Sequence, residues 1–134
     1  MVDLIKILTV DGQENTEIYN LLKKFFIIMN NQNWKIDYVF WELLLLKYIG
    51  FDLNISNFCK YDLTSNNKKR YFIENLSKKL IVPNFLVESD KNNICDRDIF
   101  NALILISEYM KKNIFLPNNL NLPHSRQNFI NYFK

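Results

Sequence analysis

Residues 32–49 would be apolar on almost every side of a helix, and few folds have a place for such a segment. The apolar run is broken by Glu42 and Lys47, so it falls short of the roughly 18–20 residues of a membrane span. A helix of this kind belongs in the middle of a bundle. We therefore expect residues 32–49 to form a central buried helix, with Trp41 as one of its structural residues.

Gly50 marks the end of this predicted helix. A glycine directly after the last helical residue suits the left-handed C′ position that closes a helix. Phe51 can then fold back onto the last turn. We expect Gly50 to have this structural role.

Apolar residues spaced three and four apart predict three more helices, at about 16–30, 96–115 and 124–133. The residues expected to be buried are Ile18, Leu21, Leu22, Phe25, Phe26 and Met29 in the first, Ile99, Leu103, Ile106, Met110 and Ile114 in the second, and Phe129, Ile130 and Phe133 in the third. Residues 2–8 resemble the last two turns of a helix that begins outside the chain.

Capping residues stand at the starts of the predicted helices. Asn15 and Thr16 offer a cap for the first, and Asp96 or Asp98 can cap the second. Pro123 suits the first position of the last helix.

Between the helices, residues 52–70 are polar and aperiodic, which predicts an irregular excursion anchored by Ile55 and Phe58. The β-prone runs 71–73 and 79–82 predict a short hairpin that leans on the helices, since two strands alone are marginally stable. Pro83 is expected to stop the second strand.

The length of 134 residues suits one domain. We therefore predict a mainly α fold over residues 1–134, a helical bundle with a small β-hairpin excursion at about 52–86.

Patterns that usually carry catalysis are missing from the sequence. His124 is the one histidine and has no evident catalytic partner, and with Gly12 and Gly50 as the two glycines no usual phosphate-binding loop can be assembled. Asp96 and Asp98 do not face each other on a helix, so capping is the better interpretation. We expect a protein that is not an enzyme and has no cofactor.

Charge and cysteine content narrow the class further. The net charge of +3 and the pI near 8.8 permit an acidic partner without indicating a nucleic-acid surface. Cys59 and Cys95 cannot form a disulfide framework, so each is expected to be a small half-buried residue. The first residues lack the pattern of a signal peptide, and the cytoplasm is the expected compartment.

Glu42 is a carboxylate within the most apolar helix, and a buried carboxylate needs partners. We expect a structural role, in which Glu42 accepts hydrogen bonds from backbone N–H groups of the 51–58 segment or pairs with a base such as Lys47.

Basic residues gather at the two ends of the predicted hairpin, as Lys68, Lys69 and Arg70 and as Lys78 and Lys79. Tyr71 and Phe72 lie alongside. Basic side chains beside aromatic rings suit single-stranded nucleic acid or an acidic peptide tail. The alternative is a solvated turn with no partner.

Several segments occur in an order that is specific as a set. They are Tyr38-Val39-Phe40-Trp41-Glu42-Leu43 running on to Ile49-Gly50-Phe51-Asp52-Leu53, then Cys59, then Tyr71-Phe72-Ile73 to Ile81-Val82 with Pro83-Asn84-Phe85-Leu86, and finally Leu122-Pro123-His124-Ser125-Arg126. Taken together they resemble the C-terminal region of the bacterial recombination mediator RecO, in its α-proteobacterial form.

This resemblance implies a non-enzymatic protein of DNA repair and homologous recombination, of the RecF-pathway type, associated with the nucleoid. The implied partners are the single-stranded-DNA-binding protein, the mediator RecR and single-stranded DNA, with no membrane. No counterpart of the family's N-terminal OB-fold domain is found, so the chain is expected to be a truncated form.

The resemblance also has departures. Some family members bind zinc through two Cys-x-x-Cys pairs, but here Cys59 is followed by Asp62, and Val82 stands where the second pair would start. One thiolate cannot hold tetrahedral zinc, so no metal is expected. Phe40 stands where family members often have an arginine, in the region that receives the acidic, Phe-ended tail of the single-stranded-DNA-binding protein.

A groove flanked by Lys35, Lys47 or Arg126 could still accept such a tail, and Arg126 is therefore counted with the five hairpin cations as a candidate binding residue. The alternative function is a helical adaptor that binds protein partners only.

Overall fold

The computed structural model describes residues 3–5, 16–75, 78–88 and 91–134, and its fold is mainly α with a small antiparallel sheet. In chain order the elements are α2 (Thr16–Met29), α3 (Trp34–Tyr48), α4 (Ile55–Phe58), β1 (Lys60–Leu63), β2 (Lys69–Asn75), β3 (Lys78–Val82), the 3₁₀ turn η1 (Asn84–Leu86), α5 (Asp96–Met110), the π-helical turn η2 (Lys111–Phe115), the 3₁₀ turn η3 (Leu116–Asn118) and α6 (His124–Asn131).

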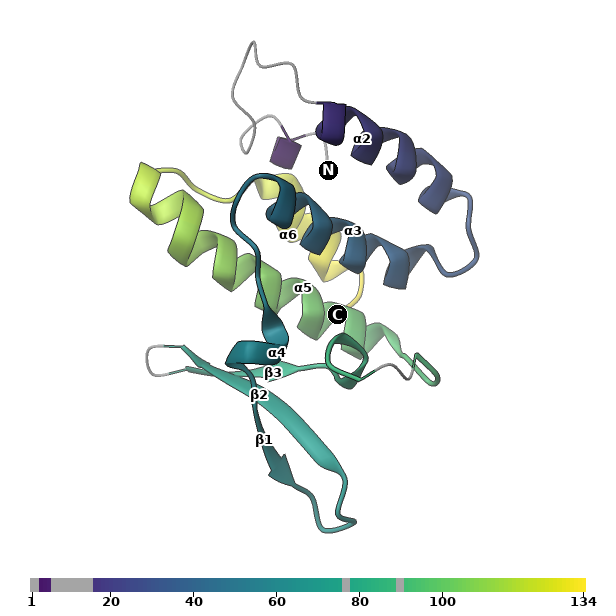
Figure 1. Ribbon diagram of the computed structural model, residues 1–134, viewed down its shortest axis with the longest axis vertical. Helices are drawn as coiled ribbons and strands as arrows, with labels where there is room; N and C mark the ends of the chain where they lie inside the picture. The colour runs from purple at the N-terminus through teal and green to yellow at the C-terminus, as the bar shows by residue number, and fades with distance from the viewer. Residues whose placement is uncertain (1–2, 6–15, 76–77, 89–90) are drawn as a thin grey trace.

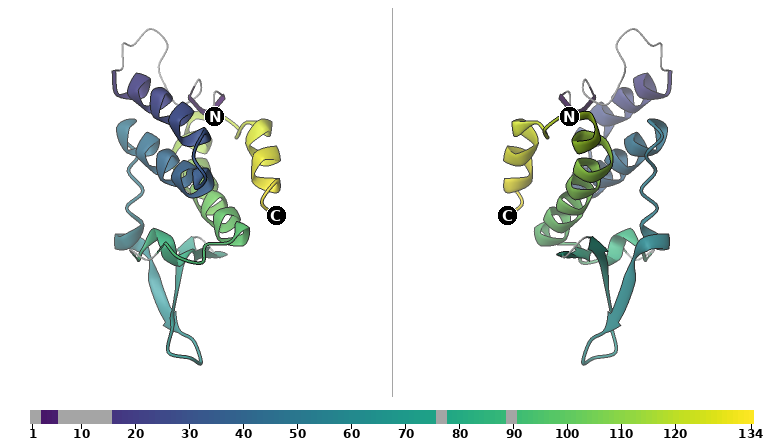
Figure 2. Two further views of the ribbon diagram at one scale, coloured as in Figure 1. Left: turned by 90° about the vertical axis from the view of Figure 1, so that its right-hand side faces the viewer. Right: turned by 90° about the vertical axis from the view of Figure 1, so that its left-hand side faces the viewer.

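The long helices form one half of the molecule and the sheet forms the other (Figure 1). Figure 2 shows α5 between α6 on one side and α2 with α3 on the other. Because α5 also contacts β3, it joins the helical half to the sheet.

The predicted buried helix is confirmed as α3, which is covered from several directions. Trp41 packs on Phe25 of α2 with ring centroids 5.5 Å apart, and Tyr38 packs on Phe129 of α6 at 5.0 Å. On a third side Phe40 meets Phe85 of η1 at 6.0 Å. An all-round apolar surface is what a helix with so many neighbours requires.

Gly50 closes α3 as predicted. Its φ is +92°, and its N–H donates to the Lys47 carbonyl at 3.1 Å, while the Phe51 N–H donates to the Leu46 carbonyl at 2.9 Å. These two bonds form a Schellman motif, in which a residue with positive φ satisfies carbonyls that the helix end would leave unpaired.

The bounds of α2 agree with the prediction, but its buried face is narrower than predicted. Ile18 and Leu21 are buried, whereas Phe26 is 64% exposed and Met29 is 37% exposed. α2 is an outer helix that packs mainly on α3, so a single stripe is covered. The helix predicted at 2–8 is described at residues 3–5 only, and the rest of it and Asn15 lie outside the described residues.

The sheet is larger than the predicted hairpin. It has three antiparallel strands in the order β1-β2-β3, with Tyr61 opposite Tyr71 and Tyr71 opposite Val82. The prediction of irregular structure for 52–70 is therefore wrong, because this stretch contains both α4 and β1. β1 has no buried residue and hence no alternating pattern to reveal it.

Within the excursion, Ile55 is a buried anchor as predicted, but Phe58 is 64% exposed and that prediction is wrong. Pro83 directly follows β3, as predicted. Cys59 is half-buried, while Cys95 is exposed and was expected to be less so.

The helices α5 and α6 follow their predicted patterns. Every residue of the α5 stripe is buried, and on the last helix Ile130 and Phe133 are buried while Phe129 is partly buried. Cys95 is the N-cap of α5, and Asp98 accepts its N–H at 3.1 Å from the third helical position. Pro123 lies just before α6 instead of at its first position.

Candidate functional site

A buried acid–base pair joins α3 to α6. Arg126 of α6 is 4% exposed and Glu42 of α3 is 2% exposed. The guanidinium contacts both carboxylate oxygens, with Nη1 donating to Oε1 and Nη2 donating to Oε2, the latter at 3.0 Å. Such a two-point contact is the strongest form of arginine–carboxylate recognition.

The remaining polar atoms of the pair are satisfied by neighbouring helices. Arg126 Nε donates to Ser107 Oγ at 2.8 Å, and that hydroxyl donates to the Leu103 carbonyl at 2.8 Å. Tyr38 Oη donates to Glu42 Oε1 at 2.7 Å. In the described part of the chain no buried side-chain polar atom is without a hydrogen bond. The network therefore ties α3, α5 and α6 together.

Burial shapes the protonation of this network. Desolvation and the Glu42 charge raise the pKa of Tyr38 well above its ordinary value, so its hydroxyl remains a donor. Desolvation alone would lower the pKa of Arg126, but the adjacent Glu42 carboxylate reverses this and raises the pKa. Arg126 therefore remains charged at neutral pH.

The prediction that Glu42 is structural agrees with this geometry, but its predicted partners are wrong. Glu42 pairs with Arg126, 84 residues away, and the Lys47 side chain is exposed. Arg126 does line a mainly apolar pocket of about 160 Å³, together with Phe25 and Phe129, but its guanidinium is already bonded to Glu42 and Ser107. The burial of Arg126 could have been predicted from its position, since Ile130 stands four residues later on the same helical face.

Trp41 is also structural, as predicted. It is 2% exposed, and its indole Nε1 donates to the Leu21 carbonyl at 2.8 Å. This bond joins α2 to α3 and satisfies the one polar atom of the side chain.

The five predicted hairpin cations fall into two groups at opposite ends of β2. Lys68, Lys69 and Arg70 lie at the turn between β1 and β2, and Lys78 and Lys79 lie at the turn between β2 and β3. The structure therefore does not bring all five into one patch.

These cations also differ in their partners. Lys79 pairs with Asp62 at 3.0 Å, and its Nζ lies 3.8 Å from the centroid of the Phe72 ring. For Lys68, Arg70 and Lys78, no ion pair is found within the described residues. Their charge is available to a partner.

Tyr71 and Phe72, predicted to stand beside the cations as stacking rings, are 8% and 7% exposed. They cannot offer a face to a partner, and that prediction is wrong. Tyr61 of β1, which sequence reasoning missed, is 55% exposed, and Lys69 Nζ lies 4.7 Å from its ring centroid.

A groove of about 260 Å³ lies between α2, α3 and residue 91. Its apolar lining includes Phe40 and Leu44, and its charged residues are Lys24, Lys91 and one acid, Asp37. Lys91 Nζ lies 4.6 Å from the Phe40 ring centroid.

The cations expected to flank a groove are placed elsewhere. Lys35 donates to Asp96 Oδ1 at 2.8 Å, a bond that raises the pKa of Lys35 and holds α3 to the start of α5. Lys24 and Lys91 therefore border the groove beside α2 and α3 in place of Lys35 and Lys47, while Arg126 lines a separate pocket.

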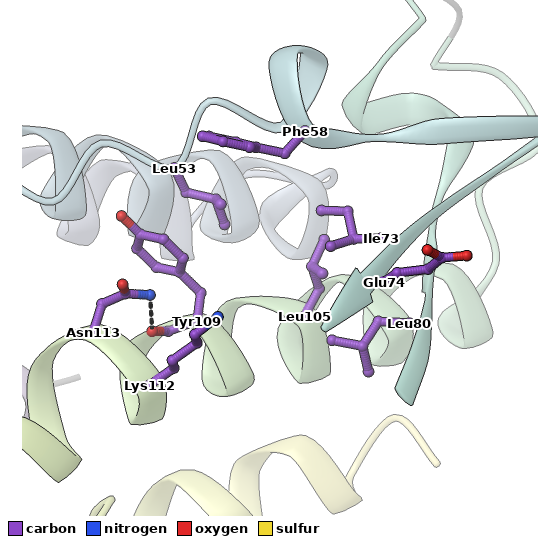
Figure 3. A pocket seen from close by; sticks show the side chains of 9 residues that line it. All are labelled: Leu53, Phe58, Ile73, Glu74, Leu80, Leu105, Tyr109, Lys112 and Asn113. Carbon is purple, nitrogen blue, oxygen red and sulfur yellow. Dashed lines mark hydrogen bonds between the residues drawn. The ribbon is translucent and has the colours of Figure 1, made fainter. Parts of the chain in front are cut away.

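A second pocket, of about 280 Å³, lies between α4, the sheet and α5 (Figure 3). Its lining is mainly apolar and includes Leu53, Phe58 and Leu105. At one end Tyr109 Oη donates to the Asp52 carbonyl at 3.4 Å. A lining of this kind suits an apolar group better than acid–base chemistry.

In residues 3–5, 16–75, 78–88 and 91–134, no three His, Cys, Asp or Glu side chains gather as metal ligands would. Across the same ranges, no helix has the length and apolar character needed to cross a bilayer.

Comparison with known proteins adds one finding. The family described as "Recombination protein O C terminal" matches residues 1–79, more than half of the chain. The match runs through α2, α3 and the first strands of the sheet. Neither the curated proteins nor the solved structures contain a match.

Proposed function

Because this chain belongs to the recombination protein O C-terminal family, whose members act in DNA recombination and repair, we propose that it is the protein-interaction and auxiliary DNA-binding part of a recombination mediator of the RecF-pathway type. In this proposal it performs no chemistry and binds no cofactor. Its partners are single-stranded DNA, the single-stranded-DNA-binding protein and RecR, and it works in the cytoplasm at the nucleoid.

The DNA-binding part of the proposal rests on one observation, that some cations of the sheet have acidic partners and others do not. Lys60 pairs with Glu74 at 3.1 Å and Lys79 pairs with Asp62 at 3.0 Å, so two of its cations are matched within the sheet. Lys68 and Arg70 are exposed and have no acidic partner among the described residues. Exposed unpaired cations are what phosphate contacts use, and each contact releases counterions.

The test is the salt dependence of binding to a short single-stranded oligonucleotide, followed by fluorescence anisotropy. In the variant Lys68→Gln, Arg70→Gln, Lys78→Gln we expect the slope of log affinity against log salt to fall by about 2, since each lost phosphate contact removes roughly 0.7.

The control variant Lys23→Gln, Lys47→Gln, Lys134→Gln removes the same charge from exposed positions outside the sheet. It should retain the slope of the wild type. Equal slopes for all three proteins would remove the sheet from the proposal.

The second candidate function is an adaptor that binds protein only, and the groove beside α2 and α3 favours it. Its apolar floor bordered by Lys24 and Lys91 suits an acidic peptide with an aromatic end. Lys91 brings a positive charge next to Phe40, the position where a family arginine is often found. The expected ligand is the acidic tail of the single-stranded-DNA-binding protein.

Calorimetric titration with an acidic peptide ending in Phe, with and without an oligonucleotide, separates the two functions. The double variant Lys24→Gln, Lys91→Gln should bind the peptide more weakly than the wild type. The double variant Lys23→Gln, Lys47→Gln should bind it with unchanged affinity. Peptide binding without any oligonucleotide binding would favour the adaptor.

A further inference from the structure

We propose that the far end of the β1–β2 hairpin, residues 61–70 and here called the hairpin tip, binds single-stranded nucleic acid by stacking an unpaired base on Tyr61. The proposal rests on the function proposed above and adds the residue that would recognise bases. It also assigns one face of the sheet to the ligand.

The strand register divides the hairpin tip into two unlike faces. Side chains alternate along a strand, and Tyr61 opposes Tyr71 while Leu63 opposes Lys69, so these four side chains share one face. A ring contact of 6.3 Å between Tyr61 and Tyr71 agrees with this placement. We call it the Tyr61 face.

The opposite face is covered by its own charges. Asp62, Phe72 and Lys79 lie there, with the Lys79 ammonium 3.0 Å from the Asp62 carboxylate and above the Phe72 ring. Lys60 pairs with Glu74 on the same side. Arg70 lies on this face as well and has no ion pair among the described residues, but the Phe72 ring is buried, so the face offers no surface on which a base could stack.

The Tyr61 face offers both elements that single-stranded nucleic acid needs. Tyr61 is 55% exposed and Leu63 is 62% exposed, and Lys69 lies beside the tyrosine ring. Lys68 adds exposed charge at the same turn, whereas Arg70 opposes Asp62 and belongs to the other face. A base stacks on an aromatic face while nearby cations follow the backbone.

One acid limits the site at its inner end. Glu88 accepts a hydrogen bond from Tyr71 Oη at 3.0 Å, on the face that Tyr61 also occupies. A phosphate would be repelled from this position. The ligand is therefore expected at the outer end of the hairpin, which Figure 1 shows extending away from the helices.

The turn that presents these groups is internally bonded. The Thr64 N–H donates to the Lys68 carbonyl at 2.8 Å, and the Asn67 N–H donates to the Thr64 carbonyl at 2.9 Å. Asn67 has φ of +56°, as expected for the residue that follows a type I turn in a hairpin. A preformed turn reduces the ordering that binding requires.

Single-stranded nucleic acid is favoured over a duplex because bases in a duplex are already stacked and paired. Stacking on an aromatic side chain typically changes affinity by about 5-fold to 150-fold per base. An acidic peptide could use the cations but has no series of bases to stack, and tighter binding of such a peptide is an outcome that the test below distinguishes.

The experiment measures oligothymidylate affinity of the whole chain for wild type, Tyr61→Leu and Tyr61→Phe. Leucine retains apolar bulk against Tyr71 but has no ring, so we expect at least about a 5-fold loss with an unchanged salt slope. Phenylalanine retains the ring and should bind like the wild type. Thermal unfolding checks that each variant is folded.

Tyr19→Leu is the matched control. Tyr19 is 58% exposed and has Lys23 Nζ 4.6 Å from its ring centroid, so it reproduces the surroundings of Tyr61 on helix α2. Its replacement should leave affinity unchanged. An oligomer of abasic sites should bind wild type and Tyr61→Leu equally.

The outcomes separate this proposal from the function it rests on. Suppose that Tyr61→Leu binds the oligonucleotide like the wild type, while the variant Lys68→Gln, Arg70→Gln, Lys78→Gln binds it more weakly. Base stacking on Tyr61 is then wrong, and DNA binding by the sheet stands. If neither variant is weakened, DNA binding by the sheet is wrong as well. Equal affinity for duplex, or tighter binding of an acidic peptide than of oligothymidylate, would also overturn the stacking proposal.

Discussion

The helical half and the sheet both use acid–base pairs to join separate parts of the chain, but in opposite surroundings. In the helical half, the Arg126 and Glu42 side chains are 3% and 2% exposed. In the sheet, the Lys79 and Asp62 side chains are 55% and 59% exposed. The same pairing chemistry therefore operates once without water and once in it.

This difference decides what each pair can do. Removing one partner of a buried pair leaves an uncompensated charge in the core, whereas water screens and replaces the partner of an exposed charge. The core pair is consequently a lock between α3, α5 and α6. The pairs in the sheet are exposed to water, so each is expected to contribute little to stability.

The largest expected effect follows from breaking the core pair. Glu42→Gln leaves the Arg126 charge buried and should lower the free energy of unfolding by about 3–5 kcal/mol, measured by urea denaturation. The double replacement Glu42→Leu with Arg126→Met removes both charges and should recover most of the loss. A loss below about 1 kcal/mol for Glu42→Gln would contradict the distinction between the two regions.

Tyr38 tests the same network through pH. Tyr38→Phe should lower stability at neutral pH by about 1.5–3 kcal/mol, because its hydroxyl donates to a carboxylate. Since the pKa of Tyr38 is raised in the folded protein, the stability linked to its neutral form is complete below about pH 10 and is lost as pH rises toward that higher value.

Above about pH 10 the wild type should therefore lose stability with a slope that includes roughly 1.4 kcal/mol per pH unit from this one group. Tyr38→Phe should lack that contribution. Melting temperatures between pH 9 and 11.5 give the two slopes, and identical slopes would remove Tyr38 from the linkage.

Gly50 stands where the helical half passes into the excursion. Gly50→Ala should cost about 1–2 kcal/mol, because alanine is strained at φ of +92° although no atom lies within 4 Å of the added methyl group. Gly50→Asn should cost less, since asparagine tolerates positive φ. Equal costs for the two variants would point to packing instead of backbone strain.

A smaller effect is expected from the exposed pair of the sheet. Asp62→Asn should lower the unfolding free energy by less than about 1 kcal/mol, and the difference should shrink further in 1 M salt. Urea denaturation at two salt concentrations measures both. A cost comparable to that of Glu42→Gln would show that this pair is as structural as the buried one.

The smallest expected effect is that of a chelator. Asp62 pairs with Lys79, and Cys59 packs partly buried against the core. At the positions where some family members hold zinc, both side chains therefore have contacts within the protein. EDTA should leave the melting temperature unchanged. A clear drop on chelation, reversed by zinc, would contradict the prediction of a zinc-free sheet.

Prediction from the sequence succeeded where local periodicity reports a local environment. The buried stripe from Ile99 in α5 to Ile114 in η2 and the end of α3 at Gly50 depend on residues within a few turns of each other. It failed for β1, because an exposed strand without alternation has no local signature. It also failed for Phe26, because exposure there depends on how many helices cover α2.

The candidate site shows the same limit. Clustering along the chain predicts the cations of the sheet, but the same pattern points to Tyr71 and Phe72 as the accompanying rings and gives no sign of Tyr61. Which face of a strand is covered depends on register and on the element packed against it. In this chain, register buries Tyr71 and leaves Tyr61 in water.

Taken alone, the amino-acid order determined where the helices lie, which stripes are apolar, and that Glu42 needs a partner, since these follow from nearest neighbours along the chain and from the cost of desolvating a charge. Only the packed molecule decided that this partner is Arg126, 84 residues away, and that Lys69 lies beside the exposed ring of Tyr61. Long-range pairing is chosen by which surfaces meet when helices and strands pack, and no local pattern encodes that choice.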